Sequence, residues 1–210
     1  MTDEVAKAYD ELAERYASLF LTELEGDIDA KAWVARFVEM VEPVWGPVVD
    51  VGCGPGSGVD MLARAGLPAF GIDASPGMIE QAELAFPWLA FFAGDLTDLD
   101  ATPEAFSGLF SRYSIIHLPP SELEAVFAEW LRVLAPGAPV LLFFFASRSP
   151  EAHGTPFDHK VTTAYELDPG TIAEIMQRVG FVELSSGATP PPEGGRPLDK
   201  GVVLARKPKR

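Results

Sequence analysis

Residues 48–58, with the sequence VVDVGCGPGSG, constrain the fold more than any other segment of the chain. They join a short apolar run, typical of a buried strand, to a glycine-rich turn and the first residues of a helix. Gly52, Gly54 and Gly56 permit tight backbone torsions and leave no Cβ between the chain and a ligand. The helix that follows offers unpaired amide groups to a negatively charged group. Many nucleotide-binding domains carry such a turn, so by itself it predicts a ligand site but not the ligand.

The rest of the chain alternates short apolar runs with amphipathic stretches, which predicts a doubly wound α/β fold with right-handed crossovers and helices on both faces of a parallel sheet. The expected strands are 48–51, 69–72, 89–93, 109–113, 140–145, 181–185 and 201–205. The expected helices are 3–20, a second from Asp27 or Asp29 to about Met40, then 56–65, 76–86, 121–134 and 169–179.

Two segments depart from this alternation. The turn 189–197, TPPPEGGRP, joins the last two strands without a helix, so the last strand should run antiparallel to its predecessor. Residues 147–167 have no clear periodicity and are expected to form a loop insertion on the substrate side, over the carboxyl edge of the sheet. We find no repeat and no second domain, and we expect one domain over 1–210, with residues 1–45 as a helical lid.

Composition excludes several classes of partner. The 210 residues carry a net charge of −15, which argues against nucleic acid, and the basic tail 206–210 is typical of a solvated chain end. Cys53 is the one cysteine, so no intramolecular disulfide can form. Residues 1–16 lack the apolar core of a signal peptide, and the longest apolar run, 138–146, is too short to cross a bilayer. We therefore expect a cytoplasmic protein without a membrane partner.

Spacing narrows the choice of ligand. The dinucleotide fingerprint would need glycine at position 57, which is Ser57, and the lysine of a phosphate-binding P-loop is absent. Instead, an acidic residue lies in or directly after each of three successive strands: Asp50, Asp73 and Asp95. A carboxylate at the second position binds a ribose diol in such folds, and one at the third position can accept a bond from an adenine amino group. Each alone is more often a cap or turn residue, but three around one glycine loop favour a nucleoside cofactor.

At this point the sequence resembles the class I S-adenosylmethionine (SAM)-dependent methyltransferases. VDVGCGPG resembles the first motif of that family, GIDASPGMIEQA the second and AGDLTDL the third, and the resemblance extends from about Tyr9 to the last strand. It implies a Rossmann-like seven-stranded sheet in the order 3-2-1-4-5-7-6. It also implies SAM as the cofactor, with S-adenosylhomocysteine (SAH) as the product.

The resemblance also implies contacts to each part of SAM. The methionine part would lie near Asp50, Gly52, Cys53, Gly54, Gly56 and Tyr113. The ribose and adenine would be held by Asp73, Ala74, Met78, Gly94, Asp95 and Leu96. The opening helix would cover the cofactor with Tyr9 and Tyr16, although both tyrosines also lie on its apolar stripe, where packing explains them equally well. Cys53 is interpreted as a small residue that fills the loop and not as a nucleophile.

Methyl transfer needs a general base only where the acceptor must lose a proton, and histidine is the natural candidate. The expected order is His159, then His117, then His153; His117 follows the fourth strand, and the other two lie in the insertion. No two histidines have the spacing of metal ligands, so we expect no metal. The Asn/Asp-Pro-Pro-Tyr/Phe motif of nucleic-acid and protein-glutamine methylation is absent. Its absence and the acidic charge favour a small-molecule acceptor.

Three hypotheses remain from the sequence alone. The first is a SAM-dependent methyltransferase, a monomer or homodimer. The second is a SAM-binding protein without transferase activity, a sensor or partner subunit, which would keep every cofactor motif. The third is a nicotinamide-dependent oxidoreductase, which would use the glycine loop and Asp73 but would have no use for Asp95 or for an antiparallel last strand.

Overall fold

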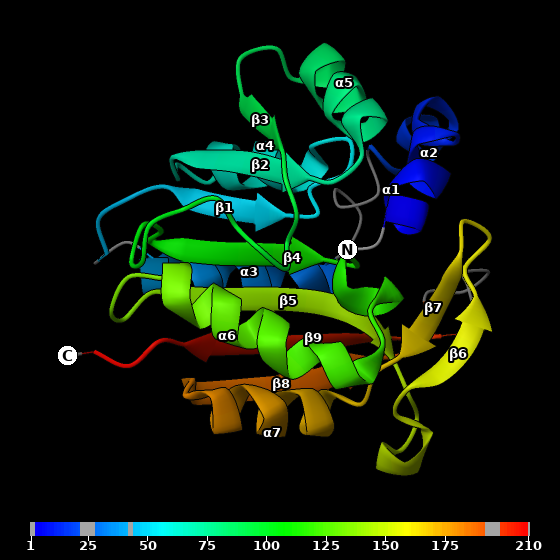
Figure 1. The fold of residues 1–210 in the computed structure, drawn as a ribbon. Coiled ribbons are helices and arrows are strands. Elements are labelled where there is room, and N and C mark those ends of the chain that lie inside the picture. Colours follow the sequence, from blue (N-terminus) through cyan, green and yellow to red (C-terminus); the bar gives the residue numbers. More distant parts are fainter. Residues whose placement is uncertain (1–2, 22–27, 42–43, 192–197, 210) are drawn as a thin grey trace.

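A computed structural model describes residues 3–21, 28–41, 44–191 and 198–209. Its main feature is one seven-stranded sheet in the order β3-β2-β1-β4-β5-β9-β8 (Figure 1). The strands are β1 (Val48–Val51), β2 (Ala69–Asp73), β3 (Ala90–Ala93), β4 (Gly108–Arg112), β5 (Pro139–Ala146), β8 (Val182–Thr189) and β9 (Asp199–Arg206). In the order of their appearance in the chain these are strands 3-2-1-4-5-7-6, so the expected order is confirmed.

The burial of β5 and the directions of the strands agree with the sequence prediction. All eight residues of β5, PVLLFFFA, are buried or half-buried, as expected for a central strand covered on both faces. β1 to β5 pair in parallel, whereas β9 runs antiparallel to both β5 and β8. The expected antiparallel last strand is confirmed, and the carboxyl ends of the five parallel strands share one edge of the sheet.

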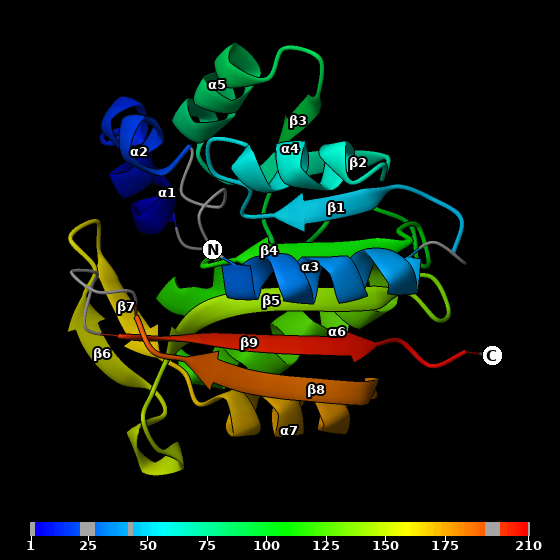
Figure 2. The same cartoon turned by 180° about the vertical axis from the view of Figure 1, so that it is seen from behind.

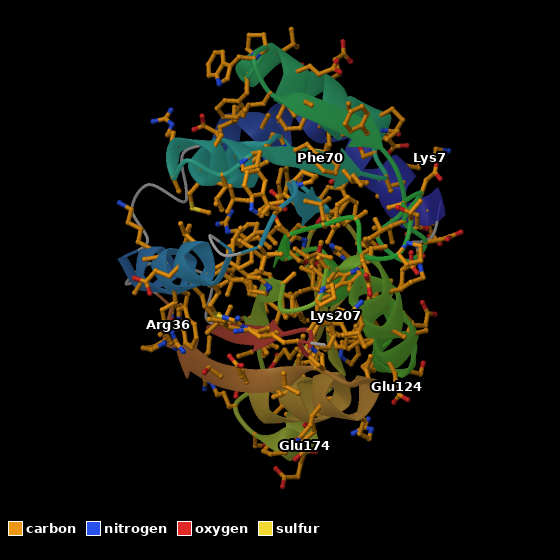
Figure 3. The ribbon with its side chains drawn as sticks, turned by 90° about the vertical axis from the view of Figure 1, so that its left-hand side faces the viewer. Lys7, Arg36, Phe70, Glu124, Glu174 and Lys207 are labelled. Carbon is orange, nitrogen blue, oxygen red and sulfur yellow. The ribbon has the colours of Figure 1, made fainter. Side chains whose placement is uncertain are left out.

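Helices cover both faces of the sheet. α3 and α4 lie on one face, α6 and α7 on the other, and α5 lies beside β3 (Figures 1 and 2). Their apolar sides supply the core, whose largest buried side chain, Trp130, donates its indole N–H to the Leu96 carbonyl at 2.9 Å. In Figure 3, Lys7, Arg36, Glu124 and Glu174 point outward from their helices. The helices are α1 (Asp3–Asp10), α2 (Ala13–Phe20), α3 (Ile28–Val41), α4 (Ser57–Arg64), α5 (Pro76–Ala85), α6 (Leu123–Val133) and α7 (Pro169–Val179).

The N-terminal helix differs from the prediction of one helix over residues 3–20. The chain forms α1 and α2 with a break at Glu11 and Leu12, where Leu12 leaves helical torsions. The Asp10 carboxylate accepts bonds from the Ser75 hydroxyl at 2.5 Å and the Gly77 amide at 2.8 Å. This attachment to the start of α5 holds α1 in place, and the break lets α2 take a different direction. Asp27, one of the two residues expected to cap α3, lies outside the described residues, and the side chain of the other, Asp29, is also not described.

Residues 147–167 are also more ordered than the predicted loop. They contain a short 3₁₀ helix (Pro150–Ala152) and an antiparallel hairpin of β6 (Thr155–Asp158) and β7 (Thr163–Glu166). The hairpin lies over the carboxyl edge of the sheet, below α1 and α2 in both views (Figures 1 and 2). The edge is therefore bordered by α1 and α2 above and by the hairpin below. Within the described residues, no helix is long and apolar enough to cross a membrane.

Candidate active site

The glycine loop between β1 and α4 has the backbone that the sequence predicts. Gly52, Gly54 and Gly56 have φ values of 72°, 52° and 90°, a region that L-residues rarely occupy. The amides of Gly52 and Cys53 donate to the Ile72 carbonyl, at 2.8 and 3.1 Å, which ties the loop to β2. A Cβ on Gly52 would overlap Ser114, whereas a Cβ on Gly54 would meet no atom within 4 Å. The loop is therefore tightly packed on one side and open above Gly54.

Asp73 connects the end of β2 to this loop. Its carboxylate accepts the Gly54 amide at 2.8 Å and the Ser75 amide at 2.9 Å. Burial raises the pKa of Asp73 above its ordinary value, and the amide bonds oppose that rise. Because two carboxylate oxygens offer about four lone-pair positions, both can still accept further hydrogen bonds. Asp73 can thus shape the loop and bind ligand hydroxyls at the same time.

Asp50 is a buried carboxyl within β1. The side chain is 2% exposed, and its Oδ1 has no hydrogen-bond partner among the described residues. Burial, with a smaller contribution from Asp73, raises the pKa of Asp50 to about 8, although Arg112 acts in the opposite direction. A buried polar atom without a partner is costly, and a cationic or hydrogen-donating ligand beside the loop would supply one.

Asp50 also makes stability depend on pH. Between the ordinary aspartate pKa of 3.8 and about 8, the folded protein keeps a proton that the unfolded chain releases, so stability falls as pH rises through this range. Asp50→Asn should therefore raise Tm more at about pH 8 than at about pH 5, by about 2–4 °C for each kcal/mol recovered. Thermal unfolding without ligand measures this, with the exposed Asp100→Asn as the matched control. An equal change in Tm at both pH values would contradict it.

Two tyrosines from the N-terminal helices close the groove above the loop. Tyr9 and Tyr16 pack edge to face, with ring centroids 5.5 Å apart. Tyr16 lines both hollows of the groove, which have volumes of about 40 and 50 Å³, and Tyr9 lines the first. Neither hollow alone is large enough for a nucleoside, so a ligand of that size requires lining side chains to move.

His117 is held by hydrogen bonds on both ring nitrogens. Nδ1 lies 2.8 Å from the Thr163 carbonyl, and Nε2 lies 2.8 Å from the Tyr9 hydroxyl. A carbonyl cannot donate, so Nδ1 carries the proton, and Nε2 of the neutral ring accepts the Tyr9 hydroxyl. Burial lowers the pKa of His117 below its ordinary value, which favours this neutral form. The groove therefore contains a neutral imidazole that is able to accept a proton at Nε2.

The other two histidines lie elsewhere. The His159 ring packs edge to face on His117, 5.2 Å between centroids, in the turn of the hairpin. The Nδ1 atom of His153 accepts the Asp168 amide at 3.0 Å, near the start of α7. Of the three, His117 lines the groove. This geometry favours His117 over His159 as the base, the reverse of the order expected from the sequence.

The structure brings most of the predicted cofactor residues together. The first hollow is lined by Tyr9, Tyr16, Gly52, Gly54, Asp73, Met78, Tyr113 and His117, and the second also by Asp50 and Cys53. Tyr113 stacks on Phe145, 4.7 Å between ring centroids.

Five predicted residues are not among those that line the two hollows. Ala74 follows the lining residue Asp73, the Gly94 amide donates to the Asp73 carbonyl at 2.9 Å, and Gly56 packs against Phe91. Asp95 accepts bonds from the amide and hydroxyl of Thr97, both at 2.8 Å. Leu96 is 1% exposed and belongs to the core. The predicted roles of these five residues toward the cofactor therefore remain predictions.

Several residues of the site were not predicted as cofactor contacts, including Pro55, Ser57 and Gly58 of the loop. Arg112 and Ser114 line the groove on either side of Tyr113, and the Arg112 guanidinium lies 5.1 Å from the centroid of the Tyr113 ring. Asp10 fixes the lid to α5, as described above. The available signal was their position, since Arg112 and Ser114 directly flank a predicted contact and Asp10 directly follows Tyr9.

The fold and this groove agree with the resemblance to class I methyltransferases, and comparison with known proteins supports it. A family model described as "Methyltransferase domain" matches residues 48–137, which run from β1 through the turn after α6. This match agrees with the resemblance of the chain's motifs to the class I SAM-dependent methyltransferases.

Similar proteins differ in what they act on. A demethylmenaquinone methyltransferase of Renibacterium salmoninarum is 29% identical over 69% of this chain and 60% of its own length. A trans-aconitate 2-methyltransferase of Rhizobium meliloti is 38% identical over 44% of this chain and 35% of its own length. The chain thus spans less than two thirds of these first curated relatives.

Solved structures share the fold at low identity. Magnesium protoporphyrin IX methyltransferase from Synechocystis PCC 6803, with bound SAM, has a TM-score of 0.70 at 20% identity and covers 99% of this chain and 98% of its own. Phosphoethanolamine N-methyltransferase 2 of Haemonchus contortus has a TM-score of 0.73 at 17% identity and covers 98% and 60%.

Proposed function

We propose that this protein is a SAM-dependent methyltransferase that acts on a small-molecule acceptor. The observation that carries the proposal is the link between Asp73 and the Gly54 amide, beside the unpartnered Asp50 carboxyl. Asp73 can bind ligand hydroxyl groups and Asp50 a positively charged group, so the pair supports a ligand that carries both. The similar proteins named above include methyltransferases of menaquinone precursors, trans-aconitate and magnesium protoporphyrin, which supports the small-molecule class.

The residues of the groove fit SAM. The open space above Gly54 admits a ligand against the backbone, and Asp73 can accept ribose hydroxyls. Asp50 lies where a cationic amino group would supply the partner that its Oδ1 lacks. When bound, SAM supplies an electrophilic methyl group on a positively charged sulfur. The aromatic faces of Tyr9, Tyr16 and Tyr113 would favour that charge by roughly 0.5–2 kcal/mol.

The chain's own residues then have three tasks. Lining side chains must move to admit the cofactor, and Tyr16 afterwards closes the groove against water. Tyr113 and the glycine loop align the methionyl end with the acceptor. His117 accepts a proton at Nε2 where the acceptor has one to lose, either directly or through the Tyr9 hydroxyl that now donates to it.

Ligand preference separates this proposal from the oxidoreductase hypothesis. Isothermal titration of the protein should give saturable SAH binding and no NADH binding, because the loop lacks the third glycine of the dinucleotide fingerprint. NADH binding without SAH binding would contradict the assignment of SAM as the cofactor. SAH binding without methyl transfer to any of a broad panel of phenols, amines and carboxylic acids would favour the non-catalytic SAM-binding protein.

A further inference from the structure

A second cavity lies between α2 and the turn of the hairpin formed by β6 and β7. Its volume is about 350 Å³, which is enough for a small organic molecule and much larger than either hollow of the groove. In Figures 1 and 2 the tip of the hairpin points toward the N-terminal helices. The lining residues are Leu12, Arg15, Tyr16, Leu19, His159, Lys160 and Val161.

This cavity adjoins the groove, because the two share a lining residue. Tyr16 lines both hollows of the groove and also the second cavity. His159 lines the cavity and packs on His117, which lines the groove. A molecule in the cavity would thus adjoin the bound cofactor across Tyr16 and the histidine pair, as required for an acceptor that receives a methyl group from it.

The charged residues among the described lining of the cavity, Arg15 and Lys160, are both cationic. No aspartate or glutamate is among its described lining residues. No carboxylate of the described chain forms an ion pair with Arg15 or Lys160. The net charge of the chain is −15, so most of its surface repels anions. The two cations that line this cavity would instead attract an anion. The carboxylate and phosphate groups are the natural partners of such a pair.

The backbone at Lys160 adds a second observation. Lys160 has a φ of 73°, a left-handed conformation that turns normally assign to glycine or asparagine. The Asp158 carboxylate accepts the Lys160 amide at 2.7 Å and so holds this strained turn. The turn thus carries a lysine where its own geometry favours another residue, which points to a use for the side chain.

Three of the lining residues are aliphatic. Leu12, Leu19 and Val161 contribute aliphatic surface, and Leu19 is 61% exposed although the helical pattern predicts it on the apolar stripe of α2. A ligand with an apolar body would cover this surface.

We infer that this cavity is the acceptor site and that it takes a small amphipathic anion, with its carboxylate or phosphate on Arg15 and Lys160 and its apolar body on the leucines. The inference rests on the proposed function. The methyl-accepting atom would lie at the opposite end of the molecule from the anionic group, toward Tyr16 and His117.

The experiment compares ligands that share a phenylpropyl body. We would titrate 3-phenylpropionate, 3-phenylpropyl phosphate, 3-phenylpropanol and 3-phenylpropylamine into the protein saturated with SAH. At least one anion should bind at least tenfold more tightly than the alcohol and the amine, and added salt should reduce this preference. The stronger of the two anions identifies the head group. Equal affinity for all four compounds, or no measurable binding of either anion, would overturn the inference.

Variants assign the preference to the cavity. Arg15→Gln and Lys160→Asn should each reduce anion affinity at least fivefold while SAH affinity stays within twofold. Asparagine tolerates the left-handed turn, so Lys160→Asn should not lower Tm, and a loss of folding cannot explain its effect. Arg178→Gln, on an exposed face of α7, is the matched control and should retain the preference. An unchanged preference in both cavity variants would overturn the inference.

Failure of the inference is distinguishable from failure of the proposed function. If the wild-type protein does not bind SAH, the proposed function fails. If it binds SAH but shows no preference for the anions, the cofactor assignment stands and the acceptor inference alone is wrong.

Discussion

Asp73→Ala is expected to weaken SAH binding by about 1–3 kcal/mol, which is roughly 5- to 150-fold in Kd. Two losses contribute. The ribose hydroxyls would lose a charged acceptor, and the amides of Gly54 and Ser75 would lose the oxygens that now hold them at 2.8 and 2.9 Å. The second loss releases the glycine loop, so the groove would be less well formed before any ligand binds.

Two measurements separate these losses. Titration with SAH gives the total effect, and thermal unfolding without ligand gives the contribution of the loop alone. Asp100→Ala makes the same substitution at an exposed aspartate and serves as the control. A lower Tm without ligand together with unchanged SAH affinity would mean that Asp73 is only structural, and the cofactor assignment would lose its main support.

The sheet could be predicted because its signals are local. Each parallel strand is a short apolar run, and a predicted helix separates each successive pair of them except the third and fourth. The turn 189–197 has no room for a crossover helix, which already requires an antiparallel last strand. Helix caps are local in the same way: the Asp168 carboxylate accepts the Thr171 amide at 2.7 Å at the start of α7, which begins at residue 169 as predicted.

The break between α1 and α2 could not be predicted, because its cause is distant in sequence. The helical pattern continues through Glu11 and Leu12, and the contacts of Asp10 are made with Ser75 and Gly77. The hairpin of β6 and β7 was missed for another reason. Each strand has four residues, and three of the four in β6 are exposed, so no alternation of buried and exposed positions marks it.

The candidate site divides in the same way. The glycine loop and Asp73 follow each other within one strand–turn–helix unit, and sequence spacing was sufficient to find them. The state of His117 depends on the Thr163 carbonyl and the Tyr9 hydroxyl, from two segments that only the folded chain brings together. The sequence could therefore nominate three histidines, but it could not rank them.

His117→Ala is expected to reduce turnover by about 10²- to 10⁴-fold for an acceptor that must lose a proton, the range typical of general-base catalysis. SAH affinity should change much less, because His117 reaches the groove from the segment after β4 and makes none of the contacts of the glycine loop. Turnover is measured as SAH formation with the best acceptor from the compound panel. His153→Ala, at a histidine bonded near α7, is the matched control and should remain active.

The pKa of His117 determines the direction in which turnover should change with pH. Burial holds the pKa of His117 below its ordinary 6.5, so the ring is neutral and basic at neutral pH and loses that ability only as acid protonates it. Wild-type turnover should decrease as the pH falls below this lowered pKa. The residual turnover of His117→Ala should not show this decrease at acid pH.

Tyr9→Phe then separates two roles for the hydroxyl that now occupies Nε2. If Tyr9 relays the proton, kcat should fall nearly as far as in His117→Ala. If Tyr9 only holds α1 over the groove, KM should rise while kcat and its acid limb persist. Full activity of His117→Ala at all pH values would remove His117 as the base, and His159, 5.2 Å away, would be the next residue to replace.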